Sequence, residues 1–180
     1  MLRTERLIVR PVSETDRARF VGLFSDAEFM TFSASGPLAS EAAELRFDHM
    51  VDLGREVPFA KQAVIEPSTG STIGYAGVDV FEFRELERLE FGYRLVPEAR
   101  GQGYATEAAR VLLDLARTTF RGELLAFIDP QNHASRCVLD KLGFEFLEHL
   151  RLLGDPVELY GLAVGVTGPV PGEAAQYRGR

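Results

Sequence analysis

The sequence of 180 residues has one cysteine, three histidines and no tryptophan. A disulfide needs two cysteines, so Cys137 excludes an internal disulfide and also a zinc site built from cysteines. The histidines, His49, His133 and His149, are far apart and lack the short ligand spacing of a metal motif, so we expect no metal site. Because Cys137 lies among apolar residues, we expect it to be a small buried residue rather than a nucleophile.

Long hydrophobic runs are also missing. No apolar stretch approaches the ~20 residues that span a bilayer, and no apolar segment follows the charged N-terminus. We therefore expect no signal peptide, no membrane association and, by default, a cytoplasmic protein. Positive charge is scarce, since 20 basic residues against 27 acidic ones give a net charge of −7. This balance argues against a nucleic-acid partner. It is compatible with a cationic acceptor, such as an amine, and solubility alone explains it at least as well.

The length and composition are those of one globular domain. A chain of this size buries about 70% of its unfolded surface, and 46% hydrophobic with 26% charged residues is ordinary for a soluble fold. Glycine and proline interrupt every pattern from Gly165 onward. We therefore expect a single domain over residues 1–164 and a mobile tail over 165–180.

Hydrophobic periodicity predicts about seven strands and about four helices. The strands are expected at 6–10, 59–66, 72–83, near 87–96, 123–128, 145–153 and 157–164, the last two as a hairpin about Gly154-Asp155-Pro156. The helices are expected at 13–25, 40–53, near 104–119 and 132–142. Because strands outnumber helices and come partly in runs, the fold class is α+β with a mixed sheet.

The most informative segment covers residues 95–106, where a strand pattern meets a helix pattern at a glycine turn. Gly101 and Gly103 lack Cβ atoms where the backbone turns sharply, and the first N–H groups of the helix face outward. With Arg100 beside them, these groups predict an anion site, typically for a phosphate. The alternative is that the glycines only make a tight connection.

A second segment, residues 130–144, follows an apolar strand pattern. Asn132 is a good N-cap, an apolar stripe of Ala134, Val138 and Leu142 recurs every four residues, and Gly143 suits a left-handed helix end. The segment therefore predicts a capped helix packed on the sheet.

Taken together, Arg100-x-x-Gly103-x-Ala105, Asn132-x-x-Ser135 and Lys141-Leu142-Gly143-Phe144 resemble motifs of the GNAT superfamily of N-acetyltransferases. More narrowly, the chain is similar to the branch that acetylates the N-termini of ribosomal proteins. The narrower resemblance rests on three further segments, which are Thr4–Pro11, Ile73–Gly77 and Glu90–Tyr93.

The resemblance implies a mixed, mostly antiparallel sheet with a central V-shaped splay between the strand that ends at Leu95 and Val96 and the strand at 124–128. Acetyl-CoA would lie in the splay, with its pantetheine paired to the backbone of Leu95 and Val96. Asn132 would hold the pantetheine from the far side. Lys141 could reach the 3′-phosphate, although a solvated helix position is the simpler explanation for it. The pyrophosphate would be lined by Arg100, Gly101, Gln102, Gly103, Tyr104, Ala105 and Thr106.

The implied reaction is attack of a neutral amine on the thioester. Removing the proton at pH 7 costs about 1 kcal/mol for an α-amine and about 4.6 kcal/mol for a lysine, so an α-amine needs only a modest base. Glu90 is the candidate base, and a surface glutamate beside Arg88 or Arg94 is the alternative. For the leaving thiol, the resemblance points to Ser135, because Leu139 stands where many relatives have a tyrosine. A helix-start hydroxyl bonded to the backbone is the alternative for Ser135.

The sequence is therefore interpreted as that of an acetyl-CoA-dependent N-acetyltransferase whose acceptor is a primary amine, in the first place a protein N-terminal α-amine. Two alternatives stay open: a small-molecule amine as the acceptor, or an acyl-CoA-binding module without turnover. Tyr93, Tyr104 and Phe32 could line the acceptor cleft or belong to the core. The sequence does not determine the oligomeric state, and a homodimer is one possibility.

Overall fold

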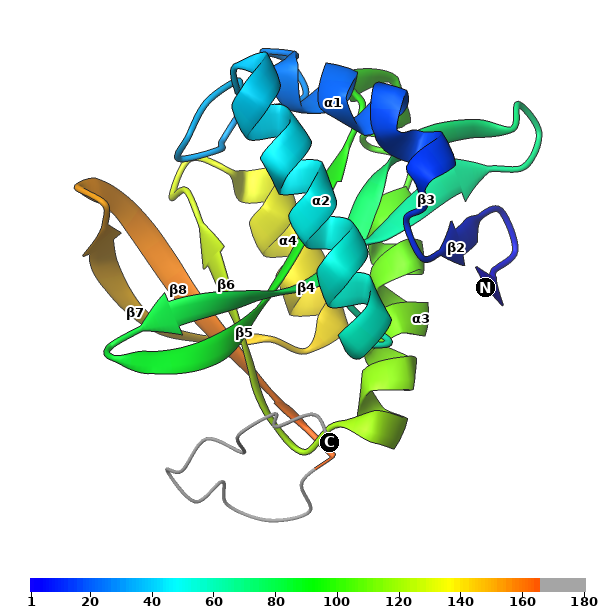
Figure 1. Cartoon of the computed structure of the whole chain (residues 1–180). Helices are drawn as coiled ribbons and strands as arrows, with labels where there is room; N and C mark the ends of the chain where they lie inside the picture. The colour runs from blue at the N-terminus through cyan, green and yellow to red at the C-terminus, as the bar shows by residue number, and fades with distance from the viewer. Residues whose placement is uncertain (166–180) are drawn as a thin grey trace.

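The computed structural model in Figure 1 describes residues 1–165. Within this range eight strands form one sheet, accompanied by four α-helices and two short 3-10 helices. The tail predicted at 165–180 lies outside the described residues, apart from Gly165. In chain order the elements are β1 (Leu2–Arg3), β2 (Ile8–Arg10), η1 (Glu14–Asp16), α1 (Arg17–Ser25), α2 (Ser40–Glu56), β3 (Gln62–Glu66), β4 (Ser71–Phe83), β5 (Leu86–Leu95), η2 (Pro97–Ala99), α3 (Tyr104–Thr119), β6 (Gly122–Ile128), α4 (His133–Leu142), β7 (Glu145–Leu152) and β8 (Asp155–Val164).

The sheet has the strand order β1-β2-β3-β4-β5-β6-β8-β7. Every neighbouring pair is antiparallel except β5 and β6, which run parallel in the centre of the sheet. The prediction of an α+β fold with a mixed, mostly antiparallel sheet is confirmed. The strand that the sequence patterns did not indicate is β1, which has only two residues.

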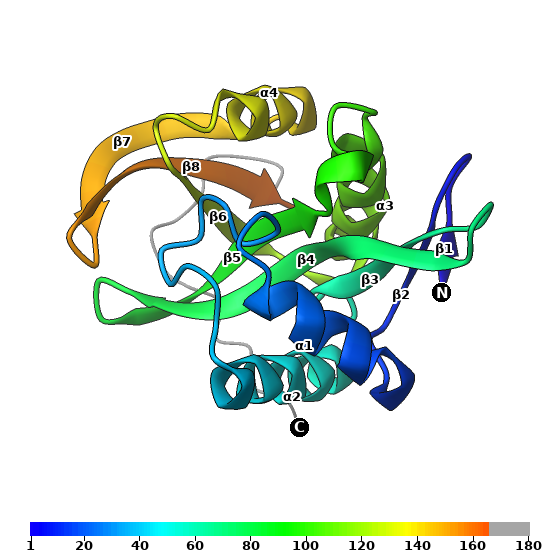
Figure 2. The same ribbon diagram turned by 90° about the horizontal axis from the view of Figure 1, so that it is seen from above.

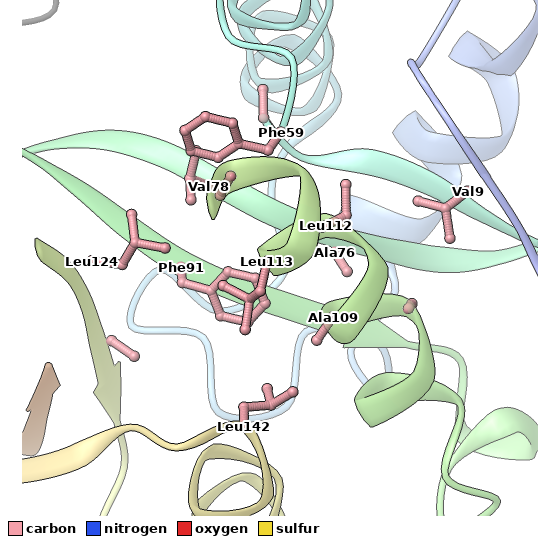
Figure 3. Close-up of a cluster of buried hydrophobic side chains, with 14 of the residues drawn as sticks. Val9, Phe59, Ala76, Val78, Phe91, Ala109, Leu112, Leu113, Leu124 and Leu142 are labelled. Atoms are coloured by element: carbon pink, nitrogen blue, oxygen red, sulfur yellow. The ribbon is translucent and has the colours of Figure 1, made fainter. Parts of the chain in front are cut away.

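Figure 2 shows α1 and α2 on one side of the sheet and α3 and α4 on the other. Each face therefore has its own apolar core, as the period of two along a strand requires. Figure 3 shows Ala109, Leu112 and Leu113 of α3 among the sheet residues Val78 and Phe91. On the opposite face, a cluster of aromatic side chains packs between α1, α2 and the sheet. Its rings are Phe20, Phe24, Phe29, Phe47 and Tyr75.

Several element boundaries differ by a few residues from the predicted ones, and two of them have a clear local reason. The helix predicted at 13–25 begins as the 3-10 turn η1, where the Ser13 N–H donates to the Asp16 carboxylate at 2.9 Å. The β7–β8 turn is Leu153-Gly154, with φ of +53° and +99°, rather than the predicted Gly154–Pro156. Pro156 lies inside β8 and pairs with Arg151 of β7. The pairing of β8 with β6 ends at Glu158, so the missing N–H of Pro156 removes no hydrogen bond to β6.

Helix α4 has the predicted caps but a different buried face. The Asn132 side chain accepts a hydrogen bond from the Ser135 N–H at 3.0 Å, and Gly143 has a φ of +86°. The buried residues of α4 are Leu139 and Leu142, so the predicted stripe is only partly right. The prediction that Cys137 is buried is wrong, because Cys137 lies about 200° around the helix from Leu139 and is exposed.

Candidate functional site

The two central strands separate soon after they meet. β5 and β6 share only the pairs Leu89↔Leu124 and Glu90↔Leu125, whereas β5 stays paired with β4 as far as Leu95. From Phe91 to Leu95 the edge of β5 that faces β6 is therefore unpaired. An unpaired strand edge presents N–H and C=O groups that an extended ligand can bind as an added strand.

The backbone at the end of β5 shows which groups face this opening. The Val96 N–H donates to the Ile73 carbonyl at 2.9 Å, and the Val96 carbonyl accepts from the Ala99 N–H at 3.0 Å. Hydrogen-bonded pairs alternate in an antiparallel ladder, so the N–H and C=O of Leu95 point to the other edge, toward the opening. Of the two residues that the sequence selected here, Leu95 has the free N–H.

The glycine turn then carries the chain from β5 into α3. Gly101 and Gly103 have φ of +74° and +83°, a region that residues with a Cβ rarely adopt. Gly103 is the N-cap of α3, and no side chain caps this helix end. The first N–H groups of α3, at Tyr104, Ala105 and Thr106, therefore have no partner inside the helix, and the dipole adds a partial positive charge. This arrangement can bind an anion through the backbone.

The polar side chains of the turn serve to hold it in place. The Arg100 guanidinium donates to the Leu95 carbonyl at 3.0 Å and to the Glu28 carbonyl at 2.7 Å. The Gln102 amide donates to the Glu98 carbonyl at 2.7 Å. Arg100 and Gln102 thus lie at the glycine turn with both side chains engaged with backbone oxygens. Any anion at this turn is contacted first by the backbone.

A clamp from the N-terminal segment braces the same turn, and the sequence patterns did not indicate it. Arg6 donates to the Glu107 carboxylate at 2.8 Å and to the Gln102 carbonyl at 3.0 Å, and it lies 4.6 Å from the centroid of the Tyr104 ring. Glu107 also accepts from the Thr4 hydroxyl and the Arg6 N–H. The acidic residue in the first turn of α3 was the only signal for this clamp. Tyr104 is buried and donates to Glu66 at 3.1 Å.

Glu90 lies on the face of the sheet opposite Leu89 and Phe91, as the alternation along the strand predicts. Its partner is neither Arg88 nor Arg94, because its Oε2 is 3.4 Å from the Nζ of Lys61. Its side chain is 25% exposed. A Cβ added to Gly92 would lie 3.3 Å from Oε1, so the bare glycine keeps this side of Glu90 open.

A buried ion-pair network continues from Glu90. Lys61 is 5% exposed and also binds Asp79 at 2.9 Å, and Asp79 binds His49 at 2.6 Å and Arg46 at 3.2 Å. Burial alone lowers the pKa of Lys61, but the charges of Glu90 and Asp79 outweigh it and the pKa is raised. For Asp79 burial raises the pKa, but the charge and hydrogen bond of Lys61, together with the hydrogen bond to His49, outweigh it and lower the pKa to about 2.

Ser135 lies in the first turn of α4, across the opening from β5. Its N–H is held by Asn132, and its hydroxyl oxygen accepts a hydrogen bond from the Tyr93 hydroxyl at 3.0 Å. Among residues 1–165, the side-chain hydrogen bond of this hydroxyl is thus made with Tyr93 and not with the helix backbone. Tyr93 belongs to β5, so the structure brings together side chains from both sides of the opening.

The remaining predicted residues lie apart from this group. Lys141 is exposed in the last turn of α4, about 9 Å along the helix axis from Ser135. Phe32 is 51% exposed. Among residues 1–165, no three His, Cys, Asp or Glu side chains are placed to hold a metal ion. No helix in that range is long and apolar enough to cross a membrane.

Comparison with known proteins gives the family. Residues 6–145 match the acetyltransferase (GNAT) domain, which is more than half of the chain, and the chain therefore belongs to the GNAT acetyltransferase family. The chain is 28% identical to YkkB of Bacillus subtilis over 160 residues, which are 87% of this chain and 92% of that protein. It is also 28% identical over 146 residues to the uncharacterized N-acetyltransferase p20 of Bacillus licheniformis, covering 80% and 82% of the two chains.

Solved structures share the fold. An acetyltransferase from Agrobacterium tumefaciens aligns with a TM-score of 0.75 and 26% identity over 89% of this chain and 92% of that one. A phosphinothricin acetyltransferase from Sinorhizobium meliloti, in complex with acetyl-CoA, aligns with a TM-score of 0.74 and 21% identity over 97% of this chain and 100% of that one. A ribosomal-protein-S5-alanine acetyltransferase from Vibrio fischeri aligns with a TM-score of 0.74 and 18% identity over 93% of this chain and 98% of that one.

The clamp at Glu107 predicts an acid-sensitive contribution to stability. Burial raises the pKa of Glu107, but the hydrogen bonds from Thr4 and Arg6 outweigh it, so the folded pKa lies below the ordinary value of 4.5. The stabilisation is therefore complete above pH 4.5 and is lost as the pH falls through the lower folded pKa. We expect Glu107→Gln to cost about 1–2 kcal/mol near pH 7 and to flatten the loss of stability toward pH ~3.

Urea unfolding across this pH range measures the effect. Glu98→Gln is the matched control, because Glu98 is exposed in η2 and its side chain has no partner among the contacts of residues 1–165. Equal acid slopes for the wild type and Glu107→Gln would mean that the clamp contributes nothing to the pH dependence.

Proposed function

We propose that this GNAT protein is an acetyl-CoA-dependent N-acetyltransferase that acetylates a primary amine, in the first place the N-terminal α-amine of a protein. The observation that carries the proposal is the continuous backbone surface formed by the unpaired edge of β5 and the uncapped start of α3. An extended amide chain that ends in a pyrophosphate matches this surface, because the edge binds amides and the helix start binds anions.

In this mode a pantetheine carbonyl accepts from the Leu95 N–H, and the pyrophosphate lies on the N–H groups of residues 101–106. Because Gly103 has a positive φ and only Arg6 within 4 Å of an added Cβ, the turn allows a close approach of the phosphates. Asn132 lies on the far side of the opening, where α4 begins. The thioester then lies between Glu90 on one face of β5 and Ser135 on the other.

The chemistry follows from these positions. Glu90 takes a proton from the incoming amine, directly or through water, and the amine attacks the thioester carbonyl. The C–S bond then breaks, and the Ser135 hydroxyl donates a hydrogen bond to the departing thiolate. A carboxylate of this kind suits an α-amine, whose deprotonation costs about 3.6 kcal/mol less than that of a lysine side chain.

Proteins of this fold differ in the acceptor that they use. The structural neighbours include a ribosomal-protein-S5-alanine acetyltransferase and a phosphinothricin acetyltransferase, with the same TM-score. A small-molecule amine is therefore the second candidate acceptor, and an acyl-CoA-binding module without turnover is the third candidate function.

Cofactor binding is tested at Gly103. Acetyl-CoA at about 100 times its Kd is expected to stabilise the wild type by about 2.7 kcal/mol, which raises the melting temperature by about 5–10 °C. Gly103→Val is expected to abolish this rise, because valine rarely adopts the φ of +83° that opens the turn and its side chain would occupy the place of the phosphates. Thermal denaturation with and without acetyl-CoA measures both values.

Gly70→Val is the matched control for backbone strain. Gly70 has a φ of +69°, open space around an added Cβ, and a place in the β3–β4 turn. We expect it to lower the melting temperature of the free protein and to keep the rise with acetyl-CoA. A full rise in Gly103→Val would contradict the placement of the pyrophosphate.

The acceptor is tested with two matched peptides. One has a free N-terminal amine and no lysine, and the other has a blocked terminus and one lysine. Because of the difference in deprotonation cost, we expect faster release of the CoA thiol with the free terminus near pH 7. Small amines form the third arm of the panel. A preference for the lysine or for a small amine would assign the protein to the second candidate, and no turnover of any amine to the third.

The role of Glu90 is tested by the pH dependence of kcat/KM. Glu90→Gln keeps an oxygen for Lys61 but cannot accept a proton, so we expect a loss of about 10²–10⁴-fold near pH 7 and partial recovery at higher pH, where solvent deprotonates the amine. Glu87→Gln, an exposed position on the same strand, is the control and should follow the wild type. Superimposable wild-type and Glu90→Gln profiles would show that Glu90 is not the base.

A further inference from the structure

The contact between Tyr93 and Ser135 is the only side-chain hydrogen bond, among the described residues, that joins β5 to α4 across the opening. Tyr93 lies on β5 in the part that no longer pairs with β6, and Ser135 lies one turn into α4. The two hydroxyl oxygens are 3.0 Å apart. The sequence patterns placed Tyr93 only among residues of the cleft or the core.

The direction of this hydrogen bond leaves the Ser135 hydrogen free. A serine hydroxyl has one hydrogen and two acceptor positions, and here one acceptor position is filled by Tyr93. Within residues 1–165, no acceptor is recorded for the Ser135 hydroxyl hydrogen, while the Ser135 N–H is fixed by Asn132. The hydroxyl is thus held at its oxygen, and its hydrogen remains available to a group in the opening.

Tyr93 is suited to remain the donor of this pair. Burial raises the pKa of its phenol, and this effect exceeds the lowering by Ser135; the nearby thiol of Cys137 on α4 raises it further. The phenol therefore stays protonated at neutral pH. The Asn132 side-chain oxygen accepts from the Ser135 N–H and so holds the backbone of Ser135 rather than its hydroxyl.

We propose that Tyr93 is a positioning residue, which donates to the Ser135 oxygen so that the Ser135 O–H points at the sulfur of the departing coenzyme A. When the C–S bond breaks, its electron pair goes to sulfur, and the Ser135 O–H stabilises the thiolate by a hydrogen bond. No proton is transferred from Ser135 to the sulfur at this step. The proton lost by the amine goes to Glu90 or to solvent. This inference rests on the place of Ser135 in the proposed function.

The test uses coenzyme A itself and needs no acceptor amine. The pKa of the bound thiol is read from the ultraviolet absorbance of the thiolate during a pH titration. Desulfo-coenzyme A, titrated on the same protein, provides the blank that removes the tyrosines and Cys137. The titration is made with the wild type, Tyr93→Phe, Ser135→Ala and the double variant, and the Kd of desulfo-coenzyme A is measured for each.

We expect Ser135→Ala to raise the pKa of the bound thiol by about 1 unit, because a hydrogen bond to a charged group is lost. Tyr93→Phe should raise it by about 0.5 unit, since the Ser135 hydroxyl is then free to rotate and is less polarised. The double variant should match Ser135→Ala, because Tyr93 acts only through Ser135. The Kd of desulfo-coenzyme A should stay within about twofold throughout, a difference of about 0.4 kcal/mol.

Tyr160→Phe is the control, since it removes a buried hydroxyl that donates to Glu158 rather than to Ser135, and it should leave the thiol pKa unchanged. Additive shifts in the double variant, or no shift in Tyr93→Phe, would overturn the positioning role while coenzyme A still binds. A wild type that does not bind coenzyme A would overturn the proposed function together with this inference.

Discussion

The early end of the β5–β6 pairing is the constraint on which the rest of the site depends. Each strand has a longer partner on its other side, because β5 pairs with β4 along its full length and β6 pairs with β8 from Gly122 to Ile128. The two halves of the sheet are thus each held by their own antiparallel pairs and meet over only two residue pairs. A sheet built in this way exposes a central strand edge, which most folds protect.

The exposed edge is useful only if the chain after it is held in one conformation. Three guanidinium groups do this by donating to backbone carbonyls rather than to carboxylates alone. Arg100 joins the end of β5 to Glu28, Arg94 binds the carbonyls of Phe29 and Thr31, and Arg6 binds that of Gln102. Because the polar side chains of the turn are used internally, the proposed phosphate contacts fall to N–H groups, whose positions the glycine φ values fix.

The sequence predicted the parts of this structure that depend on local chemistry. The positive φ values of Gly101, Gly103 and Gly143 and the capping by Asn132 follow from single residues and their neighbours, and the structure has them. Pairs between distant segments could not be read from one sequence. The Arg6–Glu107 clamp, the Lys61–Glu90 contact and the Tyr93–Ser135 hydrogen bond join residues 29 to 101 positions apart, and no periodicity marks them.

Cys137 shows the same limit within one helix. Its neighbours Val138 and Leu139 are apolar, but which side of α4 is buried depends on how the helix packs against the sheet. The buried residues of α4 are Leu139 and Leu142. The exposed Cys137 is thus a consequence of how the helix is rotated on the sheet, which a stripe of three apolar residues did not define.

The Glu90 carboxylate has two roles, because it balances the charge of the buried Lys61 and is the proposed catalytic base. Lys61 is a fully buried ammonium whose charge is balanced by Glu90 and Asp79, and a buried charge left without a partner is strongly destabilising. Removal of the Glu90 side chain would therefore disturb the core under α2 as well as the reaction. In Glu90→Gln the amide keeps an oxygen near Lys61, so this variant tests the role as a base with less disturbance of the core than Glu90→Ala. The same contact orients the Glu90 side chain on its strand. Lys61 fixes one carboxylate oxygen, and Gly92, without a side chain, leaves space beside the other.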